Sequence, residues 1–148
     1  MDYQHCEHAW HIMPACFSIV TKTSVDDIIK FCGHDGSELV WPEYGDLGRL
    51  GFHTQEMIRY CLTIGYSVTA LTQNFISQRD KSTVYYNYSE DYRNRDFYDL
   101  LRHYYGVVSC NEGMCVWDGQ RFYNPYSDKF IDFIDQDIYV FLVVCKLI

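Results

Sequence analysis

The chain has 148 residues, 48% of them hydrophobic, which is enough for a sizeable core and favours a single domain over residues 1–148. Acidic residues outnumber basic ones by 20 to 12, and the net charge of −8 argues against a nucleic-acid duplex or an anionic membrane surface as partner. The seven cysteines are an odd number, and most lie in apolar patterns with no leader-like segment before them, so we expect free thiols and a cytoplasmic location.

The first predicted element is an apolar helix near residues 9–20. Pro14 suits the first turn of a helix because it lacks a backbone donor, and Ala15 is the best helix former. Phe17, Ile19 and Val20 leave little polar surface on this segment. We therefore expect this helix to be central and buried.

Two shorter helices are predicted next. Ser24 is a typical N-cap for a helix over residues 25–32, and Gly33 stands where a left-handed stop belongs. A third helix is predicted over residues 55–64, ending at Gly65, after a glycine-rich loop over residues 34–51.

Strands dominate the rest of the chain. Residues 66–71 alternate as a strand does, and residues 72–105 form a tyrosine-rich insertion that closes with a fourth predicted helix over residues 95–105. Further strands are predicted at residues 107–110, 114–117, 120–123 and 138–146. The last of these is far too short an apolar run to span a bilayer. Helices first and strands last favour an α+β fold with a mostly antiparallel C-terminal sheet.

Asp118-Gly119 between two alternating runs is the strongest short-range signal in the sequence, because this dipeptide favours a two-residue type I′ turn. A two-residue loop predicts that Trp117 faces Gln120 and that Gly113 faces Asn124 across the hairpin.

Several motifs together resemble small papain-like cysteine peptidases, in the branch that includes the bacteriocin-leader-processing peptidases. The motifs are the proline-marked helix, the Ser-capped second helix, the segment Gly65 to Val68, and the late strand pair with Trp117-Asp118-Gly119 and Asn124-Pro125. The resemblance implies a papain-like fold, with a helical N-terminal half whose central buried helix packs on the sheet.

The same resemblance implies that the peptidase chemistry is lost. Aligning the family's Cys-Gly-Pro-Ala motif on Pro14 puts Ile12 at the position of the nucleophilic cysteine. Aligning its histidine strand on Trp117-Asp118-Gly119 puts Gly113 at the position of the general base. Asn124 remains as the third member of the Cys-His-Asn triad.

Two other nucleophiles stay open as an alternative. Cys6 lies before the first helix and Cys16 lies inside it, and either is the candidate nucleophile of a cysteine-dependent peptidase or hydrolase. The bases available to them would be His5, His8, His11 and His103. Because burial inside a helix disfavours a thiolate, we expect Cys16 to be an inert core thiol.

The segment from His5 to His11 is rich in imidazole and thiolate, which are the ligands that zinc prefers. No second pair with ligand spacing completes four ligands, so no metal is expected. No phosphate-binding or dinucleotide motif is present in the sequence, and no cofactor is expected either.

The functional hypothesis is a catalytically inactive papain-like binding protein. Its predicted cleft lies between the first helix and the sheet, and the predicted ligand-binding residues are Trp10, His11, Ile12, Gly113, Trp117 and Asn124. Free amides at residues 12–15 would attract a small anionic or nucleotide-like ligand. A small acidic protein of this kind suits a phage-encoded counter-defence role in the host cytoplasm, sequestering a nucleotide immune signal or inhibiting a host defence protein. The sequence leaves a homo-oligomer open.

Overall fold

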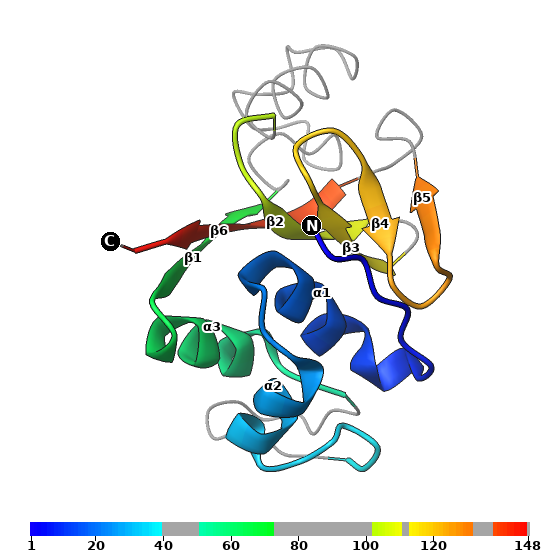
Figure 1. Ribbon diagram of the computed structural model, residues 1–148, viewed down its shortest axis with the longest axis vertical. Coiled ribbons are helices and arrows are strands. Elements are labelled where there is room, and N and C mark those ends of the chain that lie inside the picture. Colours follow the sequence, from blue (N-terminus) through cyan, green and yellow to red (C-terminus); the bar gives the residue numbers. More distant parts are fainter. Residues whose placement is uncertain (40–50, 73–101, 111–112, 132–137, 148) are drawn as a thin grey trace, which may run out of the picture.

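The computed structural model describes residues 1–39, 51–72, 102–110, 113–131 and 138–147. Over these residues the protein is α+β, with three N-terminal α-helices packed on a six-stranded antiparallel sheet (Figure 1). The sheet order is β1-β6-β2-β3-β4-β5, so the last strand in sequence lies between the first two. None of the helices described here is long and apolar enough to cross a membrane.

The first helix is buried, as predicted. A short 3-10 helix, η1 (Ala9–His11), runs directly into α1 (Ile12–Thr21). Every residue of α1 from Pro14 to Thr21 is buried, because this helix packs on β2 and β3 with one side and on α2 and α3 with others. In Figure 1, α1 lies between the sheet and α2.

The next two helices are also confirmed. The Ser24 hydroxyl oxygen caps α2 (Val25–Cys32) by accepting a 3.0 Å hydrogen bond from the Asp27 amide. Gly33 ends that helix with a φ of 79°, a conformation that favours glycine. Helix α3 (Thr54–Thr63) packs on β1, whereas α2 packs on α1 and α3 as an outer layer.

The strands are β1 (Tyr66–Thr72), β2 (Gly106–Cys110), β3 (Gly113–Trp117), β4 (Phe122–Asn124), β5 (Lys129–Ile131) and β6 (Ile138–Lys146). The predicted strands are confirmed within two residues at each boundary, and β5 is an addition that its three-residue sequence is too short to signal. The predicted fourth helix is wrong over residues 102–105, which are not helical. The rest of that helix lies outside the described residues.

The hairpin register differs from the prediction by two residues. Val116 pairs with Tyr123 and Trp117 pairs with Phe122, so the loop has four residues, 118–121. The cause is the Asp118 side chain, whose Oδ1 accepts hydrogen bonds from the amides of Gln120 at 2.8 Å and Arg121 at 2.7 Å. A side chain that satisfies two loop amides stabilises a wider loop than the Asp-Gly signal predicts.

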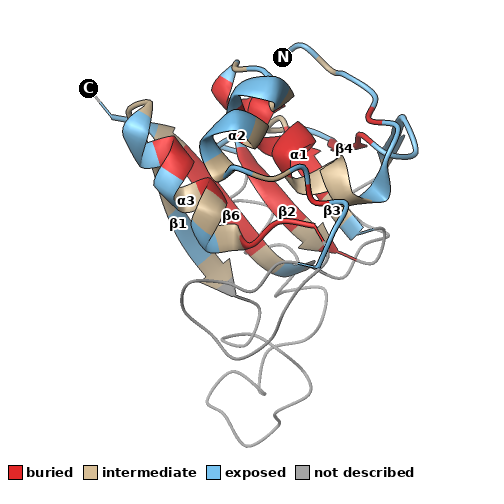
Figure 2. Ribbon diagram, turned by 90° about the horizontal axis from the view of Figure 1, so that it is seen from below, coloured by how far each residue is buried: buried red, intermediate tan, exposed pale blue. Residues whose placement is uncertain are grey.

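The sheet is buried on both faces. One face carries Val107, Val116, Leu142 and Val144, which pack with α1 and α3 in a helix-side cluster. The other face carries a far-face cluster, made of Val108, Cys110, Cys115, Trp117, Phe122, Phe141 and Val143. Figure 2 shows buried residues along both α1 and the central strands. This two-sided burial explains why β6, in the middle of the sheet, reads as a nearly continuous apolar run.

Candidate functional site

The predicted cleft residues do not come together in one place. Trp10, His11 and Ile12 lie where η1 meets α1, on the helical side of the sheet. Trp117 is fully buried in the far-face cluster, in edge-to-face contact with Phe122 at 4.9 Å between ring centroids. The sheet itself therefore separates Trp117 from Ile12, and the two cannot line the same cleft.

The predicted pairing of Gly113 with Asn124 is also wrong. Gly113 pairs with Cys110 in β2, and Asn124 pairs with Lys129 in β5. Gly113 is exposed with a φ of 92°, so glycine suits its backbone conformation. The buried Asn124 uses its Oδ1 to accept hydrogen bonds from the Tyr126 and Ser127 amides at 2.9 and 3.2 Å, which is a turn-capping role.

Two of the four positions expected to offer free amides to an anion, Ile12 and Pro14, offer none. The Ile12 amide already donates to the Ala9 carbonyl, because η1 continues the helix backwards. Pro14 has no amide to offer. A ring nitrogen of His11, Nε2, lies 2.9 Å from the Asp35 carbonyl oxygen, and Trp10 stacks on His8 at 4.6 Å between ring centroids. The side chains of His11 and Trp10 are therefore engaged in contacts within the chain, and these contacts hold η1 in its orientation.

Neither alternative nucleophile lies in an environment that favours its thiolate. Burial raises the pKa of Cys16 well above its usual value, and this thiol has no exposed surface. Burial also raises the pKa of Cys6, whose amide donates to the Pro125 carbonyl at 2.9 Å. His5 directs Nδ1 to the same carbonyl oxygen, again at 2.9 Å. Since catalytic cysteines require a lowered pKa, both are better described as core thiols.

A polar network joins α2 to α3 at a place that the sequence analysis did not single out. The Glu56 carboxylate bonds the Nε2 atom of His34 at 2.6 Å with one oxygen and accepts the His53 amide at 2.8 Å with the other. The pKa of the nearby Cys32 thiol is raised to about 12, first by burial and then by the Glu56 carboxylate. The sequence signal was the His53-to-Glu56 spacing of a capping box with an unusual cap residue.

This network has the residue types of a nucleophilic triad, but it is the carboxylate and not the imidazole that acts on the thiol. Glu56 bonds the imidazole, and its negative charge raises the pKa of the Cys32 thiol, so it suppresses ionisation of Cys32 where a base would promote it. The described residues contain no group of three or more histidine, cysteine or acidic side chains arranged to hold a metal ion. The network is best understood as a tether between two helices.

The N-terminal segment crosses the hairpin of β3, β4 and β5 and builds an aromatic surface there. The Tyr3 ring lies 5.0 Å from the rings of both Tyr123 and Phe130, and its hydroxyl donates to the Asp118 carboxylate. The guanidinium carbon of Arg121 lies 3.9 Å from the Phe130 ring centroid. Such a cation–π contact stabilises the charged side chain on the ring face.

Part of this surface is open to solvent. Phe130 is 43% exposed and Tyr105 is 55% exposed. Burial, the hydrogen bond to Asp118 and the charge of that carboxylate raise the pKa of Tyr3, and the nearby phenol of Tyr105 adds a smaller contribution. We call the four residues Tyr3, Tyr105, Arg121 and Phe130 the hairpin patch. It is an exposed aromatic surface with one fixed cation, which is the composition typical of protein interfaces.

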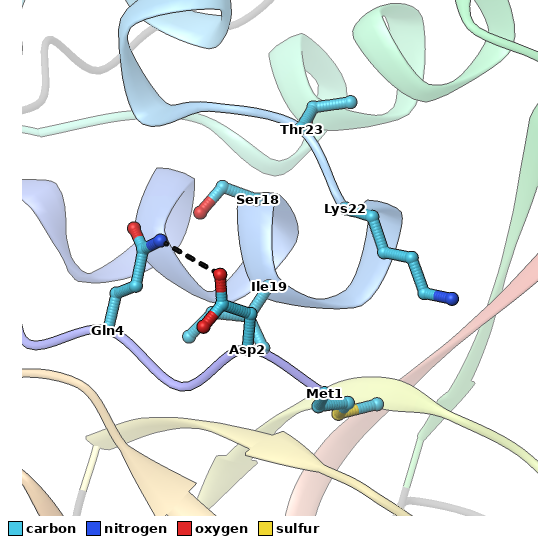
Figure 3. Close-up of a pocket in the computed structure, with 7 residues that line it drawn as sticks. All are labelled: Met1, Asp2, Gln4, Ser18, Ile19, Lys22 and Thr23. Atoms are coloured by element: carbon cyan, nitrogen blue, oxygen red, sulfur yellow. Dashed lines mark hydrogen bonds between the residues drawn. The ribbon is translucent and has the colours of Figure 1, made fainter.

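A pocket of about 370 Å³ lies between the N-terminal segment and the second half of α1 (Figure 3). Its lining residues are Met1, Asp2, Gln4, Ser18, Ile19, Lys22 and Thr23. Gln4 donates to the Asp2 carboxylate at 3.4 Å, and the Lys22 side chain points away from both (Figure 3). The pocket thus contains the carboxylate of Asp2, while the ammonium group of Lys22 points away from it (Figure 3). It also lies at the C-terminal end of α1, where the helix dipole repels an anion.

No protein family model, curated protein or solved structure matches this chain.

Proposed function

We propose that this chain is a non-catalytic binding protein whose partner is another protein. The class suggested by its sequence is a counter-defence protein that inhibits a host defence protein. The observation that carries the proposal is the hairpin patch, where the exposed Phe130 ring holds the Arg121 guanidinium on its face and also packs against Tyr3. Aromatic residues and arginine are enriched at protein interfaces and at the residues that dominate their binding energy.

The thiol environments support the non-catalytic part of the proposal. Burial raises the pKa of both candidate nucleophiles, Cys6 and Cys16, so neither is poised as a thiolate at neutral pH. The papain-like relationship is part of the same proposal. It rests on the proline-bearing α1, which is buried against the sheet, and no longer on Gly113 facing Asn124, because these two residues do not pair.

The protein-binding version is favoured over sequestration of a small anionic or nucleotide-like ligand. The residues predicted to hold such a ligand are separated by the sheet, and the Ile12 amide is occupied. The pocket beside α1 lies at the helix end that disfavours anions. The net charge of −8 instead suits a partner with a basic rim around an apolar centre.

The test uses two phenylalanines of equal exposure. Phe130 belongs to the hairpin patch and is 43% exposed, whereas Phe31 lies on the outer helix α2 and is 41% exposed. The full chain and its Phe130→Ala and Phe31→Ala variants are used to capture proteins from the same bacterial extract. We expect at least one protein to be retained by wild type and Phe31→Ala and to be lost with Phe130→Ala.

The opposite results are equally clear. A captured protein that all three chains retain to the same extent does not use the hairpin patch, and the proposal fails. Melting temperatures measured with a panel of cyclic nucleotides complete the test, because a ligand that binds only the folded state raises stability. A rise with one nucleotide, unchanged by Phe130→Ala, would replace the proposal with sequestration.

A further inference from the structure

We propose that Cys110 and Cys115 are a redox modification site, at which a peroxide or a low-molecular-weight disulfide closes an intrachain disulfide. Their Sγ atoms lie 3.8 Å apart, and both side chains are buried thiols. This inference is independent of the binding function proposed above.

The position of the two thiols in the hairpin of β2 and β3 brings them together. Val108 pairs with Cys115 and Cys110 pairs with Gly113, so the two cysteines are diagonal neighbours on adjacent strands. Both belong to the far-face cluster, and their side chains therefore leave the sheet on the same side. Diagonal neighbours are within reach of each other across an antiparallel pair.

The backbone at this end of the hairpin is irregular on both sides of the pair. Where β2 pairs with β6, the register shifts between Ser109 and Cys110, as in a β-bulge. On the other strand, Gly113 has a φ of 92° and open space around the position of a Cβ. These two irregular positions let the strands adjust as the sulfur separation shortens to the roughly 2.05 Å of a disulfide bond.

The chemistry balances with either oxidant. Both thiols are buried, so the oxidant reaches them only when this end of the hairpin opens locally. With hydrogen peroxide, the thiolate of one cysteine then attacks an oxygen, giving a sulfenic acid and one water molecule; the second thiol attacks that sulfur and releases a second water. With glutathione disulfide, one thiolate forms a mixed disulfide and the other displaces glutathione, so that two glutathione thiols are released. In both routes the pair loses two hydrogens and two electrons to the oxidant.

The geometry also predicts that the bond is easily reduced. A disulfide between diagonal positions is closed from a longer separation than one between directly opposed residues, so it retains strain in the two strands. Strained disulfides have higher reduction potentials and are the labile ones. We expect reduced glutathione to reopen the bond in the folded protein.

The experiment uses the full wild-type chain and one tryptic peptide. Trypsin cleaves after Arg102 and Arg121, and the peptide of residues 103–121 contains Cys110 and Cys115 and no other cysteine. The protein is treated with increasing concentrations of hydrogen peroxide, denatured, and alkylated at its remaining free thiols. It is then digested with trypsin, and the peptide masses are measured by mass spectrometry. We expect this peptide to lose both alkylation sites and two hydrogens before the peptide carrying the equally buried Cys61 changes.

Two variants assign the bond. Cys115→Ser should abolish the internal disulfide of peptide 103–121, whereas Cys145→Ser should leave it intact, although Cys145 packs against the same far-face cluster. The inference is overturned if peptide 103–121 keeps both alkylation sites while other cysteines are oxidised, or if Cys110 is linked to a different cysteine. The wild-type measurement decides the matter even where Cys115→Ser does not fold.

Discussion

The two faces of the sheet carry similar apolar side chains, but only one of them packs against the described helices. The helix-side face is covered by α1 and α3, which come directly from the N-terminal sequence, and it holds the main core of the protein. The far face also carries a buried apolar cluster, and it contains Trp117, the largest fully buried side chain among the residues that the structure describes. A cleft that needs residues from both faces cannot exist, which is why the six predicted ligand-binding residues separate.

The comparison is tested most severely by removing one tryptophan from each region. Trp117→Ala deletes a fully buried ring on the far face and should lower the free energy of unfolding by about 3–5 kcal/mol. Trp10→Ala removes a partly exposed ring from η1 and should cost much less. Urea unfolding of both variants measures the difference. Equal, small losses would mean that Trp117 lines an open cleft after all.

Gly106→Ala sharpens the account of how the far face is packed. A Cβ at this position would lie 2.4 Å from the Leu142 carbonyl oxygen and 2.6 Å from the Phe141 ring, so β2 and β6 approach each other only because residue 106 is glycine. Overpacking of this kind costs about 1–3 kcal/mol. The matched control is Gly113→Ala, which meets no neighbouring atom and suffers only the strain of its positive φ. A larger loss for Gly113→Ala would contradict this packing.

On the helix side, the corresponding test is Glu56→Gln. The change weakens the bond to His34 and the capping of α3, and we expect a loss of about 0.5–2 kcal/mol in unfolding free energy. Glu38→Gln, at an exposed acidic residue, is the control. Hydrogen exchange should show α2 and α3 loosened while the strands keep their protection. Loss of protection in β2 and β3 instead would mean that the two faces are not independent.

The smallest expected effect concerns the hairpin loop and depends on pH. Although burial opposes it, the hydrogen bonds from Tyr3 and from the Gln120 and Arg121 amides hold the pKa of Asp118 below its usual value. A lowered pKa in the folded state stabilises the protein at neutral pH, and this contribution is lost as the pH falls through the folded-state pKa.

The measurement is the melting temperature of wild type and Asp118→Asn at neutral pH and at pH values below the ordinary aspartate pKa of 3.8. Wild type should be the more stable at neutral pH, and the gap should close in acid. A gap that is constant with pH would show that Asp118 acts through loop geometry alone.

Local signals predicted α1, α2 and α3 well because the ends of these helices depend on neighbouring residues, whereas the helix predicted to end at residue 105 is wrong over residues 102–105. Ser24 and Gly33 bound α2 as capping rules require, and the apolar stretch after Pro14 is the buried helix. The hairpin loop was mispredicted because the Asp118 side chain stabilises a four-residue loop, and the short strand β5 carried no periodic signal.

The candidate site was less predictable because it depends on which sheet face meets α1. Alternation shows that Trp117 and Cys115 share a face, and the structure confirms it. Alternation does not show which of the two faces the helices cover when both are apolar. The hairpin patch depends on Tyr3 reaching Phe130 across the chain, and no short-range pattern predicts such a contact.

The central claim, that this is a binding protein without thiol catalysis, is tested most directly by the rate at which each cysteine reacts with iodoacetamide. The folded protein is labelled from pH 6 to pH 9, and the labelled sites are located by mass spectrometry. We predict that Cys6 and Cys16 react more slowly than in the urea-unfolded chain at every pH, since burial raises the pKa of both thiols. Rapid labelling of either one below pH 7, faster than in the unfolded chain, would identify a catalytic thiolate and contradict the account.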